Sequence, residues 1–549
     1  MSRFVGAVAA AARAHSGPRA HGLTTGEPAE PRRRTWAQVH DESLRVAAAL
    51  NAEHTPGSTI AVLAADPALI ATAVQGAWLA GCGATMLHQP TGRTDLARWA
   101  RDVLRVLGVV EARVVLLGPP FEQLAGMLDE HGVPHRDLAG LSGGDPLPAP
   151  VPVGEDATAL LQLTSGSTAE PKAVRITHGN LHANATAMAA AARLDPGSDV
   201  VVSWLPLFHD MGMVGCLAVP MWLGVEAVKV TPADFLARPM LWPELITRHG
   251  GTVTAAPNFA YAVVGRRLAR AADGEFDLSR LRFALNGAEP IDPAAVRTFT
   301  GQAARFGMAP ESVVCAYGMA ESTLGVSFAP LGRGLRVDTV DADALERRRR
   351  AEPTSPDAPR ARGFALLGAP LPGSEVEVVD DAGNPLGERE VGQLRIRGPA
   401  VTPGYRTGEG PQPAQDPAGW LDTGDDGYLA GGEIVVCGRR KDVIITGGRN
   451  IFPVDVERAA SEVDGVRAGN AAAVRLEPGS GRERFAVVLE SRQAGEAGEG
   501  ELRKAVTSAV LAAVGVRPSA VVVLPPGSLP KTPSGKLRRS AAAALVPGA

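Results

Sequence analysis

Cysteine, lysine and long apolar runs are all scarce in this chain of 549 residues. The four cysteines, at positions 82, 216, 315 and 437, lie far apart and form no CxxC pair. This excludes a disulfide framework and a cysteine-rich zinc site, and it favours a reducing cytoplasm. No apolar run approaches the ~18 residues of a transmembrane helix. With a net charge of −4, the chain has no overall electrostatic reason to bind nucleic acid or an anionic membrane.

Lysine is rare for a chain with 55 basic residues, because only six of these are lysine and the rest are arginine. A retained lysine therefore needs a reason, since a compact ammonium and a planar guanidinium bind differently. Two of the six, Lys531 and Lys536, stand in the closing segment Leu-Pro-Lys-Thr-Pro-Ser-Gly-Lys. A bland basic tail is the alternative interpretation of that segment.

Helical periods alternate with short apolar strands from about residue 36 to residue 330. The pattern predicts helices at 36–50 and 67–81 and strands at 59–63, 114–117 and 160–163. Such alternation indicates an α/β fold, in which a large N-terminal domain contains layered and largely parallel sheets.

The later part of the chain follows a different pattern. Residues 374–404 are typical of a β-rich subdomain, and 405–419 of a Gly/Pro/Gln-rich loop. Beyond them, strands at 443–445, 485–489 and 521–524 and helices at 454–462 and 501–514 form a short module. We therefore predict an N-terminal domain at 1–437 and a small C-terminal α+β domain at 438–549.

Residues 338–362 interrupt this organisation. They contain four consecutive arginines, 347–350, followed by prolines at 353, 356 and 359. A surface insertion with a short helix and a loop is expected. A solvated charged face explains the arginine run better than a binding patch does.

The strongest local motif follows the strand at 160–163. Backbone N–H groups and hydroxyls of small residues can surround phosphate oxygens there, and a lysine adds a point charge. The spacing is not that of a P-loop, and a flexible Ser/Thr turn is the alternative. The candidate phosphate ligands are Thr164, Ser165, Gly166, Ser167, Thr168 and Lys172.

Other segments place polar groups among apolar ones. His209 and Asp210 stand in Trp-Leu-Pro-Leu-Phe-His-Asp-Met-Gly-Met and either line a substrate channel or belong to a hydrogen-bonded core. Tyr317 offers an aromatic face to a purine and Glu321 offers oxygens to Mg²⁺, although a buried tyrosine with a capping glutamate is the alternative. Asp425 can accept the hydroxyls of a ribose.

Together, and in this order, these segments resemble the acyl-adenylating superfamily of acyl-CoA synthetases, luciferases and nonribosomal adenylation domains. Within it, residues 203–212 (SWLPLFHDMG), 256–261 (APNFAY) and 317–322 (YGMAES) are most similar to the fatty acyl-AMP ligases of actinobacteria. Residues 449–453 (RNIFP) and 526–530 (PGSLP) further resemble the ligase of mycobactin-type siderophore assembly.

The resemblance implies ATP and Mg²⁺ as cofactors, an N-terminal domain that binds ATP and the acyl group, and a mobile C-terminal domain. It also assigns roles to residues that match the motifs. The phosphate ligands are those named above, adenine would be framed by Gly287, Ala288, Glu289, Tyr317 and Gly318, and ribose would be bound by Asp425 and Arg439. Glu321 would ligate Mg²⁺, Lys441 would be the hinge and Lys536 would be catalytic. The acyl pocket or channel would be lined by His209, Asp210, Met211, Gly212, Phe259 and Tyr261.

Three features separate this chain from the common pattern of the superfamily. Ala169 and Ala173 replace glycines of the phosphate loop, which would weaken ATP binding if either position needs a positive φ. Ala320 stands where most acyl-CoA synthetases carry threonine, and fatty acyl-AMP ligases share the alanine. The insertion at 338–362 falls about where those ligases carry theirs, and there it is thought to brace the small domain against the large one.

The resemblance predicts activation of a medium- or long-chain fatty acid as its acyl-AMP, followed by transfer to the phosphopantetheine of an acyl carrier protein. The pathway would be siderophore or other lipid biosynthesis in the cytoplasm. An acyl-CoA synthetase is the alternative within enzymes, and a catalytically silent acyl- or nucleotide-binding protein is the alternative of another class.

Overall fold

The computed structural model describes residues 2–14, 17, 20–90, 95–164, 171–446, 449–477, 483–531 and 537–547. The chain divides into two compact units. The first contains Met1–Leu335, Leu367–Glu375 and Arg397–Leu421, and the second contains Arg336–Leu366, Val376–Ile396 and Asp422–Ala549. The boundaries of these two units differ from those of the domains predicted at 1–437 and 438–549. The predicted domain boundary therefore stays a prediction.

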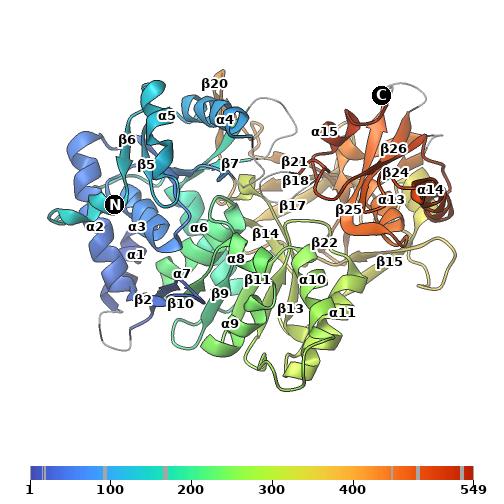
Figure 1. The fold of residues 1–549 in the computed structure, drawn as a ribbon, viewed down its shortest axis with the longest axis horizontal. Helices are drawn as coiled ribbons and strands as arrows, with labels where there is room; N and C mark the ends of the chain where they lie inside the picture. Colours follow the sequence, from blue (N-terminus) through green and yellow to red (C-terminus); the bar gives the residue numbers. More distant parts are fainter. Residues whose placement is uncertain are drawn as a thin grey trace. The chain divides into compact units, whose positions relative to one another are not determined.

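The first unit contains two eight-stranded sheets, and one of them has the order β14-β13-β12-β11-β9-β10-β1-β2 (Figure 1). The inner strands β13, β12, β11, β9, β10 and β1 pair in parallel, and the two edge strands β2 and β14 are antiparallel to their neighbours. The bounds are β1 Gly22–Thr25, β2 Arg32–Thr35, β9 Val200–Ser203, β10 Glu226–Lys229, β11 Val253–Ala256, β12 Phe283–Asn286, β13 Val313–Gly318 and β14 Gly325–Phe328.

The other sheet has the order β20-β19-β8-β7-β4-β3-β5-β6. Strands β3 to β7 pair in parallel, whereas β8, β19 and β20 are antiparallel additions. The bounds are β3 Thr59–Leu63, β4 Gly83–Met86, β5 Ala112–Leu117, β6 His135–Asp137, β7 Thr158–Leu163, β8 Lys172–Thr177, β19 Gly404–Thr407 and β20 Gly410–Pro413. The loop predicted at 405–419 is therefore wrong in part, because its first half forms a hairpin that extends this sheet.

Helices start where the sequence provides caps. Thr35 and Gln38 form a capping box at the start of α2, and the Asp66 carboxylate accepts from the Ala68 N–H at the start of α3 (2.8 Å). The helices of this unit are α1 Arg3–Ala14, α2 Trp36–Glu53, α3 Pro67–Leu79, α4 Leu96–Val109, α5 Ala125–Glu130, α6 His178–Ala191, α7 Val219–Leu223, α8 Pro232–Ala237, α9 Leu241–His249, α10 Asn258–Leu268 and α11 Pro293–Ala303.

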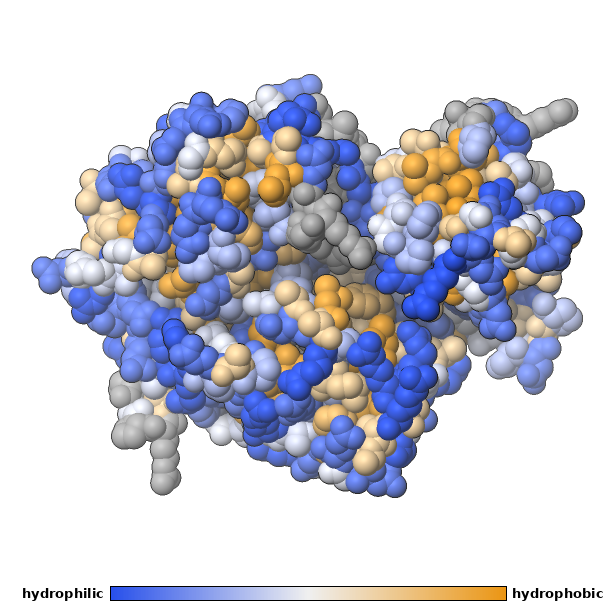
Figure 2. Space-filling view, viewed as in Figure 1, coloured by the Kyte–Doolittle hydropathy of each residue, from blue (hydrophilic) through white to orange (hydrophobic). Residues whose placement is uncertain are grey.

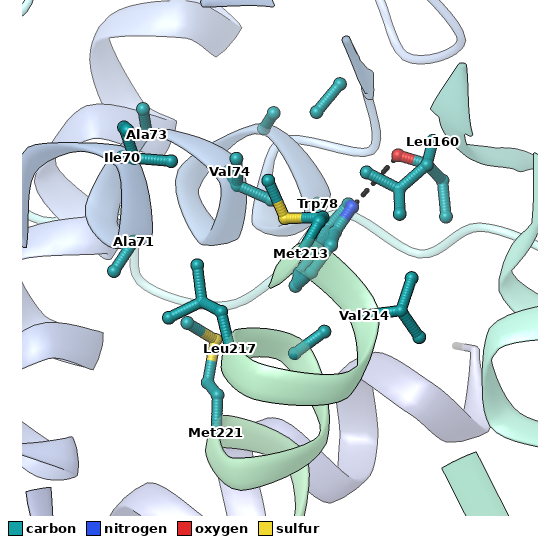
Figure 3. Close-up of a cluster of buried hydrophobic side chains, with 14 of the residues drawn as sticks. Ile70, Ala71, Ala73, Val74, Trp78, Leu160, Met213, Val214, Leu217 and Met221 are labelled. Atoms are coloured by element: carbon teal, nitrogen blue, oxygen red, sulfur yellow. Dashed lines mark hydrogen bonds between the residues drawn. The ribbon is translucent and has the colours of Figure 1, made fainter. Parts of the chain in front are cut away.

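The core of the first unit gathers around Trp78 of α3 (Figure 3). Its indole Nε1–H donates to the Ala159 carbonyl at 2.9 Å, and the Phe4 ring of α1 meets it edge-on with centroids 5.2 Å apart. Met213 and Leu217, from the π-helix Met211–Ala218, pack against the same cluster. This π-helix carries part of the predicted acyl motif and is thereby anchored on the core.

The second unit has four smaller sheets, β15-β16, β17-β18-β21-β22, β23-β24 and β25-β26-β27. Its bounds are β15 Val337–Asp341, α12 Ala342–Arg348, β16 Ala361–Ala365, β17 Glu375–Val379, β18 Gly392–Arg397, β21 Leu421–Ala430, β22 Glu433–Arg439, β23 Ile444–Thr446, β24 Arg449–Ile451, α13 Pro453–Ser461, β25 Val466–Leu476, β26 Arg484–Ser491, α14 Glu499–Val514, β27 Ala520–Leu524 and α15 Arg539–Ala543. Figure 2 shows an apolar patch near α15, and Leu545 just beyond that helix is 40% exposed.

The predicted α/β class is confirmed, and so is the short helix of the insertion, which is α12. The strands β15 and β16, which lie at the two ends of the insertion, were not predicted. All four cysteines are buried, and none forms a disulfide. Within the described ranges, no helix is both long and apolar enough to cross a membrane.

Candidate active site

The predicted phosphate segment begins where β7 ends and finishes where β8 begins. These strands pair antiparallel, with Leu163 opposite Ala173, and the Thr164 N–H points to the Lys172 carbonyl at 3.4 Å. Thr164 and Lys172 thus lie at adjacent strand ends. Ser165, Gly166, Ser167 and Thr168 lie outside the described residues, as does Ala169.

Lys172 meets two groups from distant parts of the first unit. Its Nζ lies 3.9 Å from Glu321 Oε1 and 4.1 Å from the centre of the Tyr405 ring, and the Tyr405 hydroxyl donates to the same Oε1 at 3.3 Å. The Glu321 side chain is only 13% exposed, whereas that of Lys172 is 36% exposed. The structure therefore gathers an ammonium, a carboxylate and an aromatic face at one edge of the sheets.

The predicted adenine frame lies at the carboxyl ends of two neighbouring parallel strands. Gly287, Ala288 and Glu289 follow β12, and Tyr317 and Gly318 end β13, which pairs with β12. Ligands of α/β sheets bind at such ends, so the placement agrees with a nucleotide site.

Close approach of the backbone explains the small residues in this frame. A Cβ on Gly287 would lie 3.1 Å from the Ala316 carbonyl oxygen, and one on Gly318 would lie 2.3 Å from the Leu324 carbonyl oxygen. Ala288 and Thr323 both have positive φ, at 68° and 66°. Backbone strain of this kind in residues other than glycine gathers at functional sites.

Glu289 points towards the start of α10. Its Oε1 accepts the Phe259 N–H at 2.6 Å, which satisfies a helix N-terminal donor and suits the helix dipole. The position of Glu289 is therefore fixed by α10 whether or not it also contacts adenine.

His209 and Asp210 form a contact of their own. His209 Nδ1 lies 2.7 Å from Asp210 Oδ1, and that oxygen also accepts the Met211 N–H at 2.7 Å, at the start of the π-helix. Position 212 requires a glycine, because a Cβ on Gly212 would lie 2.1 Å from the Pro206 carbonyl oxygen. π-helical turns are frequent at functional sites.

An aromatic cluster lies beside this motif. Trp204 stacks on Phe235 with centroids 3.9 Å apart and meets Phe259 edge-on at 6.1 Å. Tyr261, in contrast, is fully buried, and its hydroxyl donates to the Leu285 carbonyl at 2.8 Å. Half-buried Phe259 is placed to line a channel, whereas the burial of Tyr261 favours a packing role.

Lys229 is a buried lysine that belongs to none of the sequence motifs. It lies opposite Ser203 in the pairing of β9 with β10, and its Nζ donates to Ser203 Oγ at 3.1 Å and to the Leu205 carbonyl at 2.9 Å. It thereby holds the start of the segment that leads to His209. Burial lowers the pKa of Lys229 from 10.5 to about 8. The scarcity of lysine in the sequence was the available signal for it.

Asp425 and Arg439, the predicted ribose ligands, belong to the second unit. They are paired across β21 and β22, with Arg439 Nε 3.0 Å from Asp425 Oδ1. Lys441 follows in a short 3₁₀ turn, and its carbonyl accepts from Arg475 at 2.6 Å. Lys536 lies outside the described residues.

The candidate site thus consists of two groups that the structure assembles separately. The first unit contains the described phosphate candidates Thr164 and Lys172 together with the adenine, Mg²⁺ and acyl candidates, and the second contains Asp425, Arg439 and Lys441. Tyr405 was missed from the sequence because it stands in a segment predicted to be a loop. Within the described residues, no cluster of three or more His, Cys, Asp or Glu side chains could hold a metal by itself.

Comparison with known proteins gives consistent matches over nearly the whole chain. The AMP-binding enzyme family matches residues 10–406. Rv1013 of Mycobacterium tuberculosis, whose name describes it as a ligase, is 51% identical over 529 residues, 96% of this chain and 97% of its own. The long-chain-fatty-acid–AMP ligase FadD26 of Mycobacterium marinum is 32% identical over 538 residues, 92% of this chain and 90% of its own. A solved structure, from work on the fatty acyl-adenylate ligases of E. coli and L. pneumophila, has a TM-score of 0.89 and 30% identity and covers 99% of this chain and 97% of its own.

The buried amine of Lys229 predicts a specific dependence of stability on pH. Because its pKa in the folded protein is lower than in the unfolded chain, the unfolded state binds more protons between pH 8 and pH 10.5. The free energy of unfolding should therefore rise across this window by about 3 kcal/mol relative to Lys229→Met, which has no amine. Chemical denaturation of both proteins at a series of pH values measures the difference.

Lys504→Met is the matched control, because the Lys504 side chain is 76% exposed. Its difference from the parent should not vary with pH in this window. A difference between the parent and Lys229→Met that stays constant from pH 8 to pH 10.5 would contradict the burial of a titrating amine.

Proposed function

The chain belongs to the AMP-binding enzyme family, and we propose that it activates a medium- or long-chain fatty acid as its acyl-AMP with release of pyrophosphate. The observation that carries the proposal is the group formed by Lys172, Glu321 and Tyr405 beside the predicted adenine frame. Support for a fatty acid comes from the name of FadD26 and from the fatty acyl-adenylate ligase structure.

The chemistry requires two anions to meet. A carboxylate oxygen attacks the α-phosphorus of ATP, a new O–P bond forms, and the bond from that phosphorus to the bridging oxygen breaks as pyrophosphate leaves. The enzyme has to align both anions and neutralise the charge that gathers at phosphorus. Lys172 at the start of β8 would hold the phosphates, and Lys536 would place its ammonium between the carboxylate and the α-phosphate.

Glu321 would hold Mg²⁺ together with the phosphates of ATP. Protein sites for this ion use one or two carboxylates and complete the coordination with substrate phosphates and water, so a single partly buried carboxylate fits. When bound, Mg²⁺ supplies charge neutralisation of the triphosphate. Asp425 and Arg439 would bind the ribose.

The acyl chain would lie against the aromatic cluster beside His209. Trp204, Phe235 and Trp242 line a small, mainly apolar pocket together with aliphatic side chains from β9 and α9. Because this pocket has no room for a water molecule, an entering chain would have to displace side chains. Each methylene that it buries would contribute about 0.8 kcal/mol.

After adenylation, the acyl group would pass to the phosphopantetheine thiol of a carrier protein. Rotation of the C-terminal part about Lys441 would withdraw Lys536 and admit the thiol. Attack of the thiol on the acyl carbon forms a thioester and releases AMP. The cytoplasm, where cysteines stay reduced, is the location that fits this proposal.

The insertion supports a preference for a protein acceptor, because it contacts residues on both sides of the proposed hinge. Glu346 of α12 pairs with Arg360 within the insertion (3.0 Å) and with Arg449 beyond Lys441 (Nε–Oε2 2.9 Å). The Glu346 side chain is 2% exposed and that of Arg449 is 10% exposed. Rotation about Lys441 would break this buried pair.

The alternative within enzymes is an acyl-CoA synthetase, and no contact among the described residues favours it. A role in siderophore biosynthesis would be one setting for a ligase that serves a carrier protein. A catalytically silent binding protein would not need the Lys172–Glu321 arrangement beside a nucleotide frame.

The proposed function is tested by ATP–pyrophosphate exchange with a panel of carboxylic acids. We expect exchange with medium- and long-chain fatty acids and increasing affinity with chain length until the pocket is full, because each buried methylene adds transfer free energy. Exchange that is highest with an amino acid or benzoate, and absent with fatty acids, would overturn the proposal.

Lys536→Ala should lose acyl-AMP formation by a hundredfold or more, since removal of one well-placed charge at a transition state costs roughly 3 kcal/mol. Lys531→Ala is the matched control from the same segment and should keep exchange within about twofold, because only one of the two ammoniums is proposed to reach the phosphate. Circular dichroism checks that both variants are folded. Near-parent exchange by Lys536→Ala would remove this residue from the mechanism.

The Glu346–Arg449 pair predicts a change of acceptor. Glu346→Gln, or deletion of residues 341–360, should leave adenylation intact and raise acyl-CoA formation about tenfold, because a bias of one to two kcal/mol on the domain equilibrium is lifted. Arg348→Ala is the control, since the Arg348–Glu352 pair is exposed. Acyl-CoA formation as low in both test variants as in the parent would show that the insertion is not the gate.

A parent enzyme that forms acyl-CoA as fast as it adenylates would move the assignment to the synthetase class. Thioester formation is measured with the same fatty acid for coenzyme A and for a phosphopantetheinylated carrier protein.

A further inference from the structure

Helix α4 (Leu96–Val109) has two opposite faces. Trp99, Val103 and Leu107 are buried on the inner face. Arg98, Arg101 and Arg105, named here the arginine stripe, are exposed and recur at intervals of three and four residues, which places them on the outer face. The stripe extends about 10 Å along the helix axis.

The arginine stripe has no partner within the part of the chain that the structure describes. None of its three guanidiniums forms an ion pair or a hydrogen bond with another described residue, and Asp102 is the one carboxylate between Arg98 and Arg105. Arg136, another exposed arginine of the first unit, is in contrast paired with Glu53 (2.9 Å). Three unpaired guanidiniums side by side form a local positive surface on a chain whose net charge is −4.

The inner face of α4 lies over the residues that border the candidate site. Trp99 belongs to the same core cluster as Leu163 and Ala173, which adjoin Thr164 and Lys172. The stripe is therefore on the outer side of the helix that covers the ends of β7 and β8.

The same helix is also linked to the acyl motif. The Trp99 indole Nε1–H donates to the His88 carbonyl at 2.9 Å, and the His88 ring meets the Phe208 ring edge-on with centroids 5.3 Å apart. Phe208 directly precedes His209. The helix that carries the stripe is therefore linked, through Trp99 and His88, to the segment where the acyl group is proposed to be activated.

We infer that the arginine stripe of α4 is the docking surface for a carrier protein that presents carboxylates around its phosphopantetheine. The inference rests on the proposed transfer of the acyl group to such a protein. Guanidiniums bind carboxylates through paired hydrogen bonds, and a local patch of opposite charge steers a partner that the negative net charge would otherwise repel. Coenzyme A offers no carboxylate-rich surface, so the stripe would also help to discriminate between acceptors.

The test is the charge reversal R98E/R101E/R105E in the full-length enzyme. A panel of acidic, phosphopantetheinylated carrier proteins is first tested with the parent enzyme. The carrier protein that the parent acylates fastest serves as the acceptor. The matched control is R266E/R267E/R270E, which reverses three exposed arginines at the end of α10 that also form no ion pair with another described residue. Each enzyme is measured in ATP–pyrophosphate exchange, in transfer to the carrier and in transfer to coenzyme A.

We expect exchange to stay within about twofold in both variants, since the reversed residues lie on outer helix faces. In R98E/R101E/R105E alone, kcat/KM for the carrier protein should fall at least about tenfold, mainly because KM rises. The value of kcat/KM should also decrease less steeply with salt concentration in this variant than in the parent. A carrier with lysines in place of its surface carboxylates should recover activity with this variant. Retention of carrier transfer, or an equal loss in the control, overturns the docking surface while leaving adenylation in place.

Two other outcomes also decide the matter. An equal loss of transfer to coenzyme A and to the carrier would mean that the stripe binds a phosphate of the small acceptor, and it would overturn the inference. A parent enzyme that adenylates fatty acids but acylates none of the carriers would contradict both the proposed transfer and the docking surface.

Discussion

An ammonium shared between a carboxylate and an aromatic ring ties the candidate site together. Lys172 starts β8, Tyr405 lies on β19, and Glu321 follows β13, so the contact joins the two eight-stranded sheets of the first unit. A half-exposed ion pair at 3.9 Å contributes little stability. Its place at the strand ends, beside strained backbone at Ala288 and Thr323, is better explained by a catalytic role, in which preorganised charges stabilise the charge that develops during the reaction.

Most of the fold could be predicted where a local pattern was sufficient. The strand at 59–63 and the helix from residue 36 have the expected type and position, because apolar periodicity and a capping box act within a few residues. The hairpin of β19 and β20 was missed because Gly410, Pro411 and Pro413 are typical of loops. Its pairing depends on β8, which lies more than 200 residues earlier in the chain and leaves no local trace.

The candidate site could be predicted only in part for the same reason. Motifs identified Lys172 and Glu321 separately, but neither local pattern contains Tyr405, which contacts both. The residues that join the insertion to the C-terminal part, the buried pair of Glu346 and Arg449, could likewise not be predicted. The rarity of lysine was the one sequence signal for Lys229, and its hydrogen bond to the turn before His209 became apparent only from the three-dimensional structure.

The central claim is that a fatty acid carboxylate attacks the α-phosphorus of ATP. The most direct measurement uses a fatty acid labelled with ¹⁸O in both carboxylate oxygens, one turnover with hydroxylamine as the acyl acceptor, and mass spectrometry of the products. The account predicts one ¹⁸O atom in the released AMP and none in pyrophosphate. Label in inorganic phosphate together with ADP, or AMP without label, would contradict it.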